Sequence, residues 1–224
     1  PITLAERNLI LDKNELHDNI AIIDVGAENT DIGVFEGTTY VYTNSIPVGG
    51  ENITNDIALV LNIEKEEADK LKKQYGLALK SFIDNDNDII LNTCKDNNKN
   101  KIIKSSELIE IIEARIEDMF LIINKDLTNQ GIKSRINNVV LTGQGIVNIS
   151  KSDVAGKINL NIPVKISTGR LIGTTRPAYR TAYALVRYIA SRPFTKTVSS
   201  SIDTKSNENI IKNILERIKE FFYS

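Results

Sequence analysis

A short apolar run near the beginning of the chain most narrows the folds that it can adopt. Ile20–Val25 reads Ile-Ala-Ile-Ile-Asp-Val, without the alternation of polar and apolar residues that marks a half-exposed strand. A strand of this kind is buried on both faces, as in a sheet covered by helices on two sides. Thr30–Phe35 and Thr38–Val48, joined by a turn at Gly37, predict two neighbouring strands.

Strands and helices are expected to alternate through the rest of the chain. After a break at Gly49-Gly50, apolar spacing and capping residues predict helices at residues 54–61, 64–75, 105–127 and 177–190. Further strands are predicted at residues 89–93, 102–104, 138–141 and 163–167. This alternation is typical of an α/β layer structure, with the polar, hairpin-containing middle as an insertion.

The composition removes several classes of function. The chain has 224 residues, of which 41% are hydrophobic and 25% charged, and its formal net charge of −1 gives no basic excess for nucleic acid. One cysteine and one histidine argue against a disulfide framework, a His/Cys metal site and a Ser–His or Cys–His triad. No apolar run reaches the roughly 20 residues that span a bilayer. Because the chain begins with Pro1 and not with an initiator methionine, we expect it to be part of a longer protein.

A glycine turn between the first two strands is a candidate phosphate loop. Asp24 ends the first strand, Gly26 lies in the turn, and Thr30 begins the second strand. Such a turn can aim backbone amides at a phosphate, and a carboxylate at the strand end can hold a metal-bound water. The alternative is an ordinary strand–turn–strand connection without a ligand.

Five short segments carry a resemblance to a known family. They are, in order, Asp24–Asp31, Ile46–Gly50, Ala68–Gly76, Val139–Gly145 and Pro177–Ala182. Together they resemble the second lobe of the actin-like (ribonuclease H-like) ATPases, and most closely the FtsA family of cell-division proteins. Pro1–Glu15 also resembles the segment that precedes the second phosphate loop in that family.

The resemblance implies a domain organisation. Residues 1–63 and 131–194 are expected to form a discontinuous α/β core, and residues 64–130 a smaller inserted subdomain. Residues 195–207 are rich in serine and threonine and lack apolar periodicity, which predicts a flexible linker. Residues 208–224 are predicted to form a terminal amphipathic helix.

The nucleotide site of the family matches seven residues of this chain. By resemblance, these are Asp24, Gly26 and Thr30 for the β- and γ-phosphates, Asp69 and Lys72 for the ribose and base, and Gly143 and Gly145 for the adenosine turn. Spacing alone also fits a surface ion pair for Asp69 and Lys72, because residues i and i+3 share a helical face.

Three departures from the family pattern weaken that site. Ala27 and Glu28 stand where the phosphate loop of the family has glycines, and Gln144 replaces a glycine of the adenosine turn. A carboxylate repels a triphosphate, and a Cβ atom crowds the approach of the backbone. We therefore expect neither catalysis nor a bound cofactor in this chain, and assign ATP and magnesium to a longer parent protein only.

The middle of the chain carries the expected partner site. In FtsA-like proteins the outer subdomain binds the C-terminal peptide of FtsZ, the tubulin-like ring protein. Arg115 lies in a segment that resembles a helix of that subdomain, and Lys101 and Lys104 on the preceding hairpin are expected to add positive charge. The alternative is that Arg115 bridges Glu113, Asp118 or a neighbouring helix.

The end of the chain carries an apolar stripe. Large apolar residues recur at helical spacing from Ile210 to Phe222, with charged residues on the other face. Such a helix can lie in the interface of an anionic membrane. The residues expected to contact the membrane are Ile211, Ile214, Leu215, Ile218, Phe221 and Phe222. The alternative is a helix that docks on its own domain or on a partner.

These features together predict an adaptor rather than an enzyme. By resemblance, it would tether FtsZ filaments to the cytoplasmic face of the membrane at the division septum and could self-associate into filaments. One alternative is a nucleotide-binding ATPase or kinase of the actin-like superfamily, which does not need the terminal stripe. Another is a pilus-assembly adaptor of the same fold.

Overall fold

The structure is a computed structural model of the chain. It describes residues 2–11, 14–91, 101–167, 182–186 and 188–189, all of which belong to one compact unit, residues 1–191. The predicted linker at 195–207 and terminal helix at 208–224 lie outside the described residues. The six predicted membrane contacts lie outside them as well: Ile211, Ile214, Leu215, Ile218, Phe221 and Phe222.

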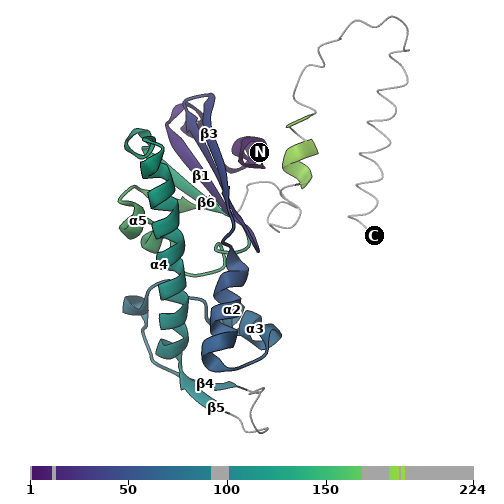
Figure 1. The fold of residues 1–224 in the computed structure, drawn as a ribbon, viewed down its shortest axis with the longest axis vertical. Coiled ribbons are helices and arrows are strands. Elements are labelled where there is room, and N and C mark those ends of the chain that lie inside the picture. The colour runs from purple at the N-terminus through teal and green to yellow at the C-terminus, as the bar shows by residue number, and fades with distance from the viewer. Residues whose placement is uncertain (1, 12–13, 92–100, 168–181, 187, 190–224) are drawn as a thin grey trace, which may run out of the picture. The chain divides into compact units, whose positions relative to one another are not determined.

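Five strands form the main sheet, in the spatial order β3-β2-β1-β6-β7 (Figure 1). Their bounds are β1 Ile20–Val25, β2 Thr30–Glu36, β3 Thr39–Ile46, β6 Asn138–Thr142 and β7 Val164–Ile166. β1 pairs antiparallel with β2 and parallel with β6, and β6 pairs parallel with β7. The predicted strands of this sheet are confirmed, with small shifts at their ends.

The central strand β1 is buried on both faces, as its apolar run predicts. Ile20 and Ile22 belong to one apolar cluster, which also contains Leu9 and Ala184 from helical segments. Ala21 and Ile23 point the other way and join a second, larger cluster, whose members include residues of the long helix of the middle region. Helical segments therefore cover both faces of the sheet, and the α/β fold class is confirmed.

Three helices of the central region match their predictions. α2 (Gly50–Leu61) starts four residues earlier than expected, α3 spans Lys65–Tyr75, and α4 spans Ser105–Asn129. The glycine pair was expected to break the chain before a helix, but Gly49 is the N-cap and Gly50 already lies in α2. The Asn52 side chain makes this possible, because its Oδ1 accepts a hydrogen bond from the Gly49 amide at 2.9 Å.

Two helices were not predicted. α1 spans Ile2–Ile10 and α5 spans Ser152–Leu160. α5 packs on α4 at Gly156, where a Cβ atom would lie closer than 3.0 Å to the Phe120 ring. Short helices with a glycine on the packing face carry a weak periodic signal, which explains why the sequence did not reveal α5. The helix predicted at 177–190 is present at 182–186 and 188–189, and its beginning lies outside the described residues.

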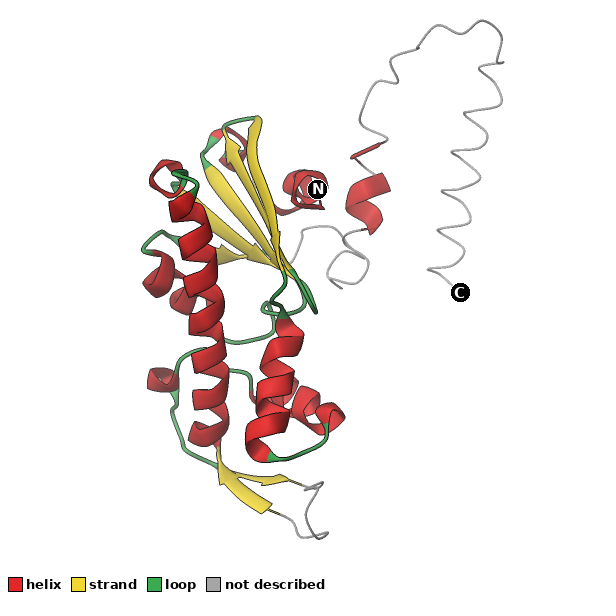
Figure 2. Ribbon diagram, viewed as in Figure 1, coloured by secondary structure: helices red, strands yellow, loops and turns green. Residues whose placement is uncertain are grey.

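A separate two-stranded sheet lies at the far end of α4. β4 (Asp88–Leu91) pairs antiparallel with β5 (Lys101–Lys104), as the predicted hairpin requires. Figure 2 shows α4 extending from beside the main sheet down to this hairpin, with α2 and α3 next to its lower half. Single 3-10 turns occur at η1 Glu15–His17, η2 Lys80–Phe82 and η3 Lys133–Arg135. The bounds of the core and the inserted subdomain stay a prediction.

No helix in the described part of the chain combines the length and the apolarity needed to cross a bilayer.

Candidate functional site

Three loops meet at the carboxyl ends of β1 and β6 and form a tight junction, which we call the glycine junction. It contains the turn after β1, the segment before α2 and the turn after β6. The amides of Gly50 and Glu51, at the start of α2, donate to the carbonyl oxygens of Gly26 and Ala27 at 2.9 and 2.8 Å. The Gly145 amide donates to the Val25 carbonyl at 2.8 Å. The first amides of α2 are thus bonded to the candidate phosphate loop itself.

The glycines of this junction are required by the chain's own backbone. A Cβ atom on Gly145 would lie closer than 3.0 Å to the Gly26 carbonyl, and one on Gly50 would meet Gly145 equally closely. Gly143 adopts a φ of +95°, and a Cβ atom there would collide with the Val25 carbonyl. The missing side chains of Gly143 and Gly145 thus give room to neighbouring backbone, and the predicted contact of these two glycines with adenosine stays a prediction.

A cavity of about 360 Å³ opens between the glycine junction and α3, and we call it the junction pocket. It brings together Asp69, Lys72 and Gly145 from the predicted nucleotide site. The other four predicted residues do not line it. Asp24 and Thr30 are buried in the strands, and the Thr30 hydroxyl donates to the Val48 carbonyl at 2.6 Å.

Lys72 is the best-connected side chain of the junction pocket. Its Nζ donates to the Gly50 carbonyl at 3.0 Å and to Thr54 Oγ1 at 2.6 Å, and pairs with Asp69 at 3.2 Å. Partial burial acts to raise the pKa of Asp69, yet hydrogen bonds from Lys73 and Lys72 hold that pKa below its ordinary value. The helix ion pair expected from spacing therefore exists, and it also faces the pocket.

The lining of the junction pocket does not fit a magnesium triphosphate. Its charged side chains are balanced, with three carboxylates against three ammonium groups: Glu51, Glu66, Asp69, Lys65, Lys72 and Lys73. Lys65 is already paired with Glu51 at 2.8 Å. Among the described residues, no group of His, Cys, Asp and Glu could hold a metal ion. The lining therefore offers a phosphate no excess of positive charge, and the Gly50 and Glu51 amides of α2 already donate to the carbonyl oxygens of Gly26 and Ala27.

A second cavity, of about 540 Å³, runs between α2 and α4 beside β5 and contains Arg115; we call it the α2–α4 groove. Its apolar lining is Val60, Leu61, Ile111 and Ala114, and its charged lining is Asp56, Glu107, Glu110, Asp118, Lys101 and Arg115. Carboxylates outnumber cations, so an acidic partner meets no simple electrostatic attraction here.

Arg115 bridges α4 to α2. Its Nε and NH2 groups both donate to the Asp56 carboxylate, the second at 3.0 Å. The hydrogen bond to Asp56 raises the pKa of Arg115 against the opposing effect of partial burial. A bridge to a neighbouring helix was one of the alternatives left open by the sequence, and Asp56 is the partner that spacing could not reveal.

The two predicted lysines of the partner site lie on opposite sides of β5. Lys101 lines the α2–α4 groove with Arg115, whereas Lys104 does not and instead pairs with Asp88 at 2.7 Å. Residues three apart in a strand point to opposite faces, so the two could not both face the groove. Lys104 therefore lies outside the groove lining, and its contribution to partner binding stays a prediction.

The sequence also missed Thr54, which contacts Lys72 in the junction pocket. Thr54 is a buried polar residue on the same helix face as Ile53 and Ile57. A polar residue on an apolar face is a usable signal, because buried hydroxyls take partners.

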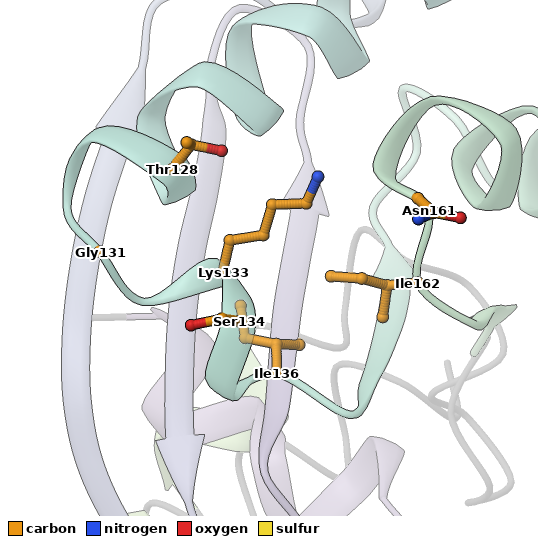
Figure 3. A pocket seen from close by; sticks show the side chains of 7 residues that line it. All are labelled: Thr128, Gly131, Lys133, Ser134, Ile136, Asn161 and Ile162. Carbon is orange, nitrogen blue, oxygen red and sulfur yellow. The ribbon is translucent and has the colours of Figure 1, made fainter.

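A third cavity, of about 480 Å³, lies at the opposite end of the sheet, between the end of α4 and the residues before β6 and β7 (Figure 3). Lys133 is the one ionisable side chain in its lining, which otherwise consists of small polar and apolar residues. This lining supports no particular ligand chemistry.

Proteins similar to this chain include FtsA proteins of several bacteria. A model of the family described as Cell division protein FtsA matches residues 21–184. The chain is 33% identical to the Cell division protein FtsA of Bacillus subtilis over 185 residues, which cover 83% of this chain and 42% of that protein. It is 25% identical to that of Pseudomonas aeruginosa over 225 residues, or 97% of this chain and 54% of that protein. The chain spans about half the length of the curated relatives it matches.

Solved structures of other proteins superpose on the fold of this chain. MreB5 of Spiroplasma citri bound to ADP superposes with a TM-score of 0.65 at 19% identity, over 84% of this chain and 58% of that one. A chain of the PilM–PilN type IV pilus biogenesis complex gives a TM-score of 0.60 at 14% identity, over 86% and 51%. At these identities the likeness shows an actin-like fold alone. Because the FtsA model extends from β1 through the sheet and its helices to residue 184, the chain belongs to the FtsA family of cell-division proteins.

Proposed function

We propose that the chain is the partner-binding part of an adaptor that tethers FtsZ filaments to the cytoplasmic face of the membrane at the division septum. Family membership over residues 21–184 is the observation that carries this proposal. The α2–α4 groove, with Arg115 and Lys101 beside apolar residues, is the surface that we assign to the FtsZ C-terminal peptide. The terminal stripe at residues 210–222 is assigned to anionic lipid, and self-association into filaments is part of the same proposal.

Reconstitution on vesicles tests the adaptor. We expect FtsZ from the same organism to sediment with anionic liposomes only when the chain is present. Arg115→Glu should abolish FtsZ recruitment while the variant itself still sediments, because losing a desolvated charge pair in an interface typically costs roughly 2–5 kcal/mol. Arg115→Gln, which introduces no repulsion with Asp56, controls for misfolding. Recruitment by the Arg115→Glu variant at the level of the unaltered chain would reject the groove as the FtsZ site.

The alternative within the same fold is a nucleotide-dependent ATPase or kinase, since MreB5 of Spiroplasma citri is described as bound to ADP and to AMPPNP. The balanced charges of the junction pocket and the engaged amides of α2 argue against this reading. We infer that the chain is not an ATPase, and that ATP and magnesium are ligands of a longer parent protein only.

Calorimetric titration with Mg-ATP checks this inference. We expect no measurable heat of binding, because Glu28 and the balanced lining offer the triphosphate no net attraction. A variant that restores the family glycines, Glu28→Gly with Gln144→Gly, should bind more tightly than the unaltered chain. A dissociation constant in the low micromolar range for the unaltered chain would contradict the inference.

A further inference from the structure

The guanidinium group of Arg115 is held between two carboxylates. Its Nε and NH2 edge is occupied by both oxygens of Asp56, and its NH1 atom lies 3.7 Å from Asp118 Oδ2. An arginine offers its donors in a planar fork, and a carboxylate that fills one edge takes two of them at once. A partner carboxylate that approaches Arg115 therefore meets a guanidinium group whose Nε and NH2 edge is already bonded to Asp56.

The Arg115–Asp56 pair lies in the wall of the α2–α4 groove rather than beneath it. Both residues line the groove, and their side chains are 28% and 27% exposed. They come from helices α4 and α2, 59 positions apart in the chain. The pair can consequently open toward solvent without breaking the apolar core, and a released Asp56 carboxylate would be rehydrated.

We propose that Asp56 is a specificity-determining residue of the α2–α4 groove, acting as an internal competitor that a partner carboxylate must displace before it reaches Arg115. This proposal rests on the proposed function, because it assumes that an acidic peptide binds in the groove. A free carboxylate in solution cannot outcompete Asp56, which is held at high local concentration by α2. A peptide can displace Asp56 when its apolar side chains pack on Val60 and Ile111. Those contacts hold the peptide carboxylate next to Arg115.

Replacement of Asp56 tests whether this residue competes with a partner carboxylate for Arg115. Asp56→Asn keeps the size and one acceptor of the side chain but removes its charge. We expect this variant to bind the C-terminal peptide of FtsZ about five- to tenfold more tightly, the gain anticipated when a partly exposed ion pair no longer has to be broken. The measurement is fluorescence anisotropy with a labelled synthetic peptide, and thermal unfolding confirms that each variant is folded.

Glu113→Gln is the matched control, because Glu113 also lies on α4 but is not part of the groove lining, and its carboxylate accepts a hydrogen bond from the Lys80 amide at 2.9 Å. It removes one negative charge at a residue that has no contact with the Arg115 fork. Affinity should change less than twofold if competition for Arg115 is the cause. An equal gain in both variants would replace the proposal with general charge repulsion.

The outcomes for the two proposals differ. If the unaltered chain binds the peptide and Asp56→Asn binds it no more tightly, the internal competitor is rejected while the adaptor stands. If neither the unaltered chain nor Asp56→Asn binds the peptide, the groove is not the peptide site and both proposals fail. A gain in Asp56→Asn that disappears in the Asp56→Asn, Arg115→Gln double variant supports the competitor.

Discussion

Replacement of Gly143 by alanine is expected to lower the free energy of unfolding by about 2–4 kcal/mol, which is a large part of the stability of a chain of this size. Two effects add at this position. The φ of +95° disfavours any side chain, and the new Cβ atom would be forced against the Val25 carbonyl and the Asp24 carboxylate. Neither neighbour can withdraw easily, because Asp24 is buried and the Val25 carbonyl accepts the Gly145 amide.

Gly131→Ala provides a control for the backbone effect alone. Gly131 also has a positive φ, of +66°, but no atom lies within 4 Å of the position that its Cβ would take. We expect a loss of only about 1 kcal/mol, the penalty of the left-handed conformation. Urea denaturation of both variants measures the difference from the shift in midpoint. Equal losses would mean that the glycine junction yields to the added methyl group.

Replacement of both Phe221 and Phe222 by glutamate is expected to abolish the sedimentation of the chain with anionic liposomes. The prediction rests on the sequence, because these residues lie outside the part of the chain that the structure describes. In a helix the two positions fall within the apolar stripe, so the variant would place two negative charges on the face that contacts the lipid. Burial of apolar surface contributes roughly 25 cal/mol per Å², and two aromatic side chains supply a large share of it.

A control with the same charge change separates the stripe from overall electrostatics. Asn209→Glu with Asn213→Glu adds two negative charges to the polar face of the same helix. This variant should lose only part of its membrane binding, through weaker attraction to anionic lipid. If both double variants sediment like the unaltered chain, the terminal helix is a docking element and the adaptor loses its membrane anchor.

The main sheet could be predicted because its strands carry their own pattern. Ile20–Val25 is uniformly apolar, and the structure buries both of its faces. α1 was missed because the segment before the first strand was interpreted through its family resemblance alone. α5 was missed because Gly156, which α4 requires for close packing, weakens the helical signal.

The sites were less predictable than the fold because their contacts are distant in sequence. Lys72 and Asp69 were found together, since one helical turn joins them. The Arg115–Asp56 pair could not be found, because nothing in a single sequence relates positions on α4 and α2. The different surroundings of Lys101 and Lys104 follow from strand geometry, which the charge of the hairpin alone does not reveal.

α2 lines the junction pocket and the α2–α4 groove, and this shared helix has a thermodynamic consequence. Gly50, Glu51 and Thr54 line the junction pocket, while Asp56 and Val60 line the α2–α4 groove. A helix is stiff along its axis, so a ligand that shifts α2 at one cavity also alters the other. Linkage then makes the effect reciprocal: an occupant of the junction pocket changes the affinity of the groove by the same factor as a groove-bound peptide changes that of the pocket.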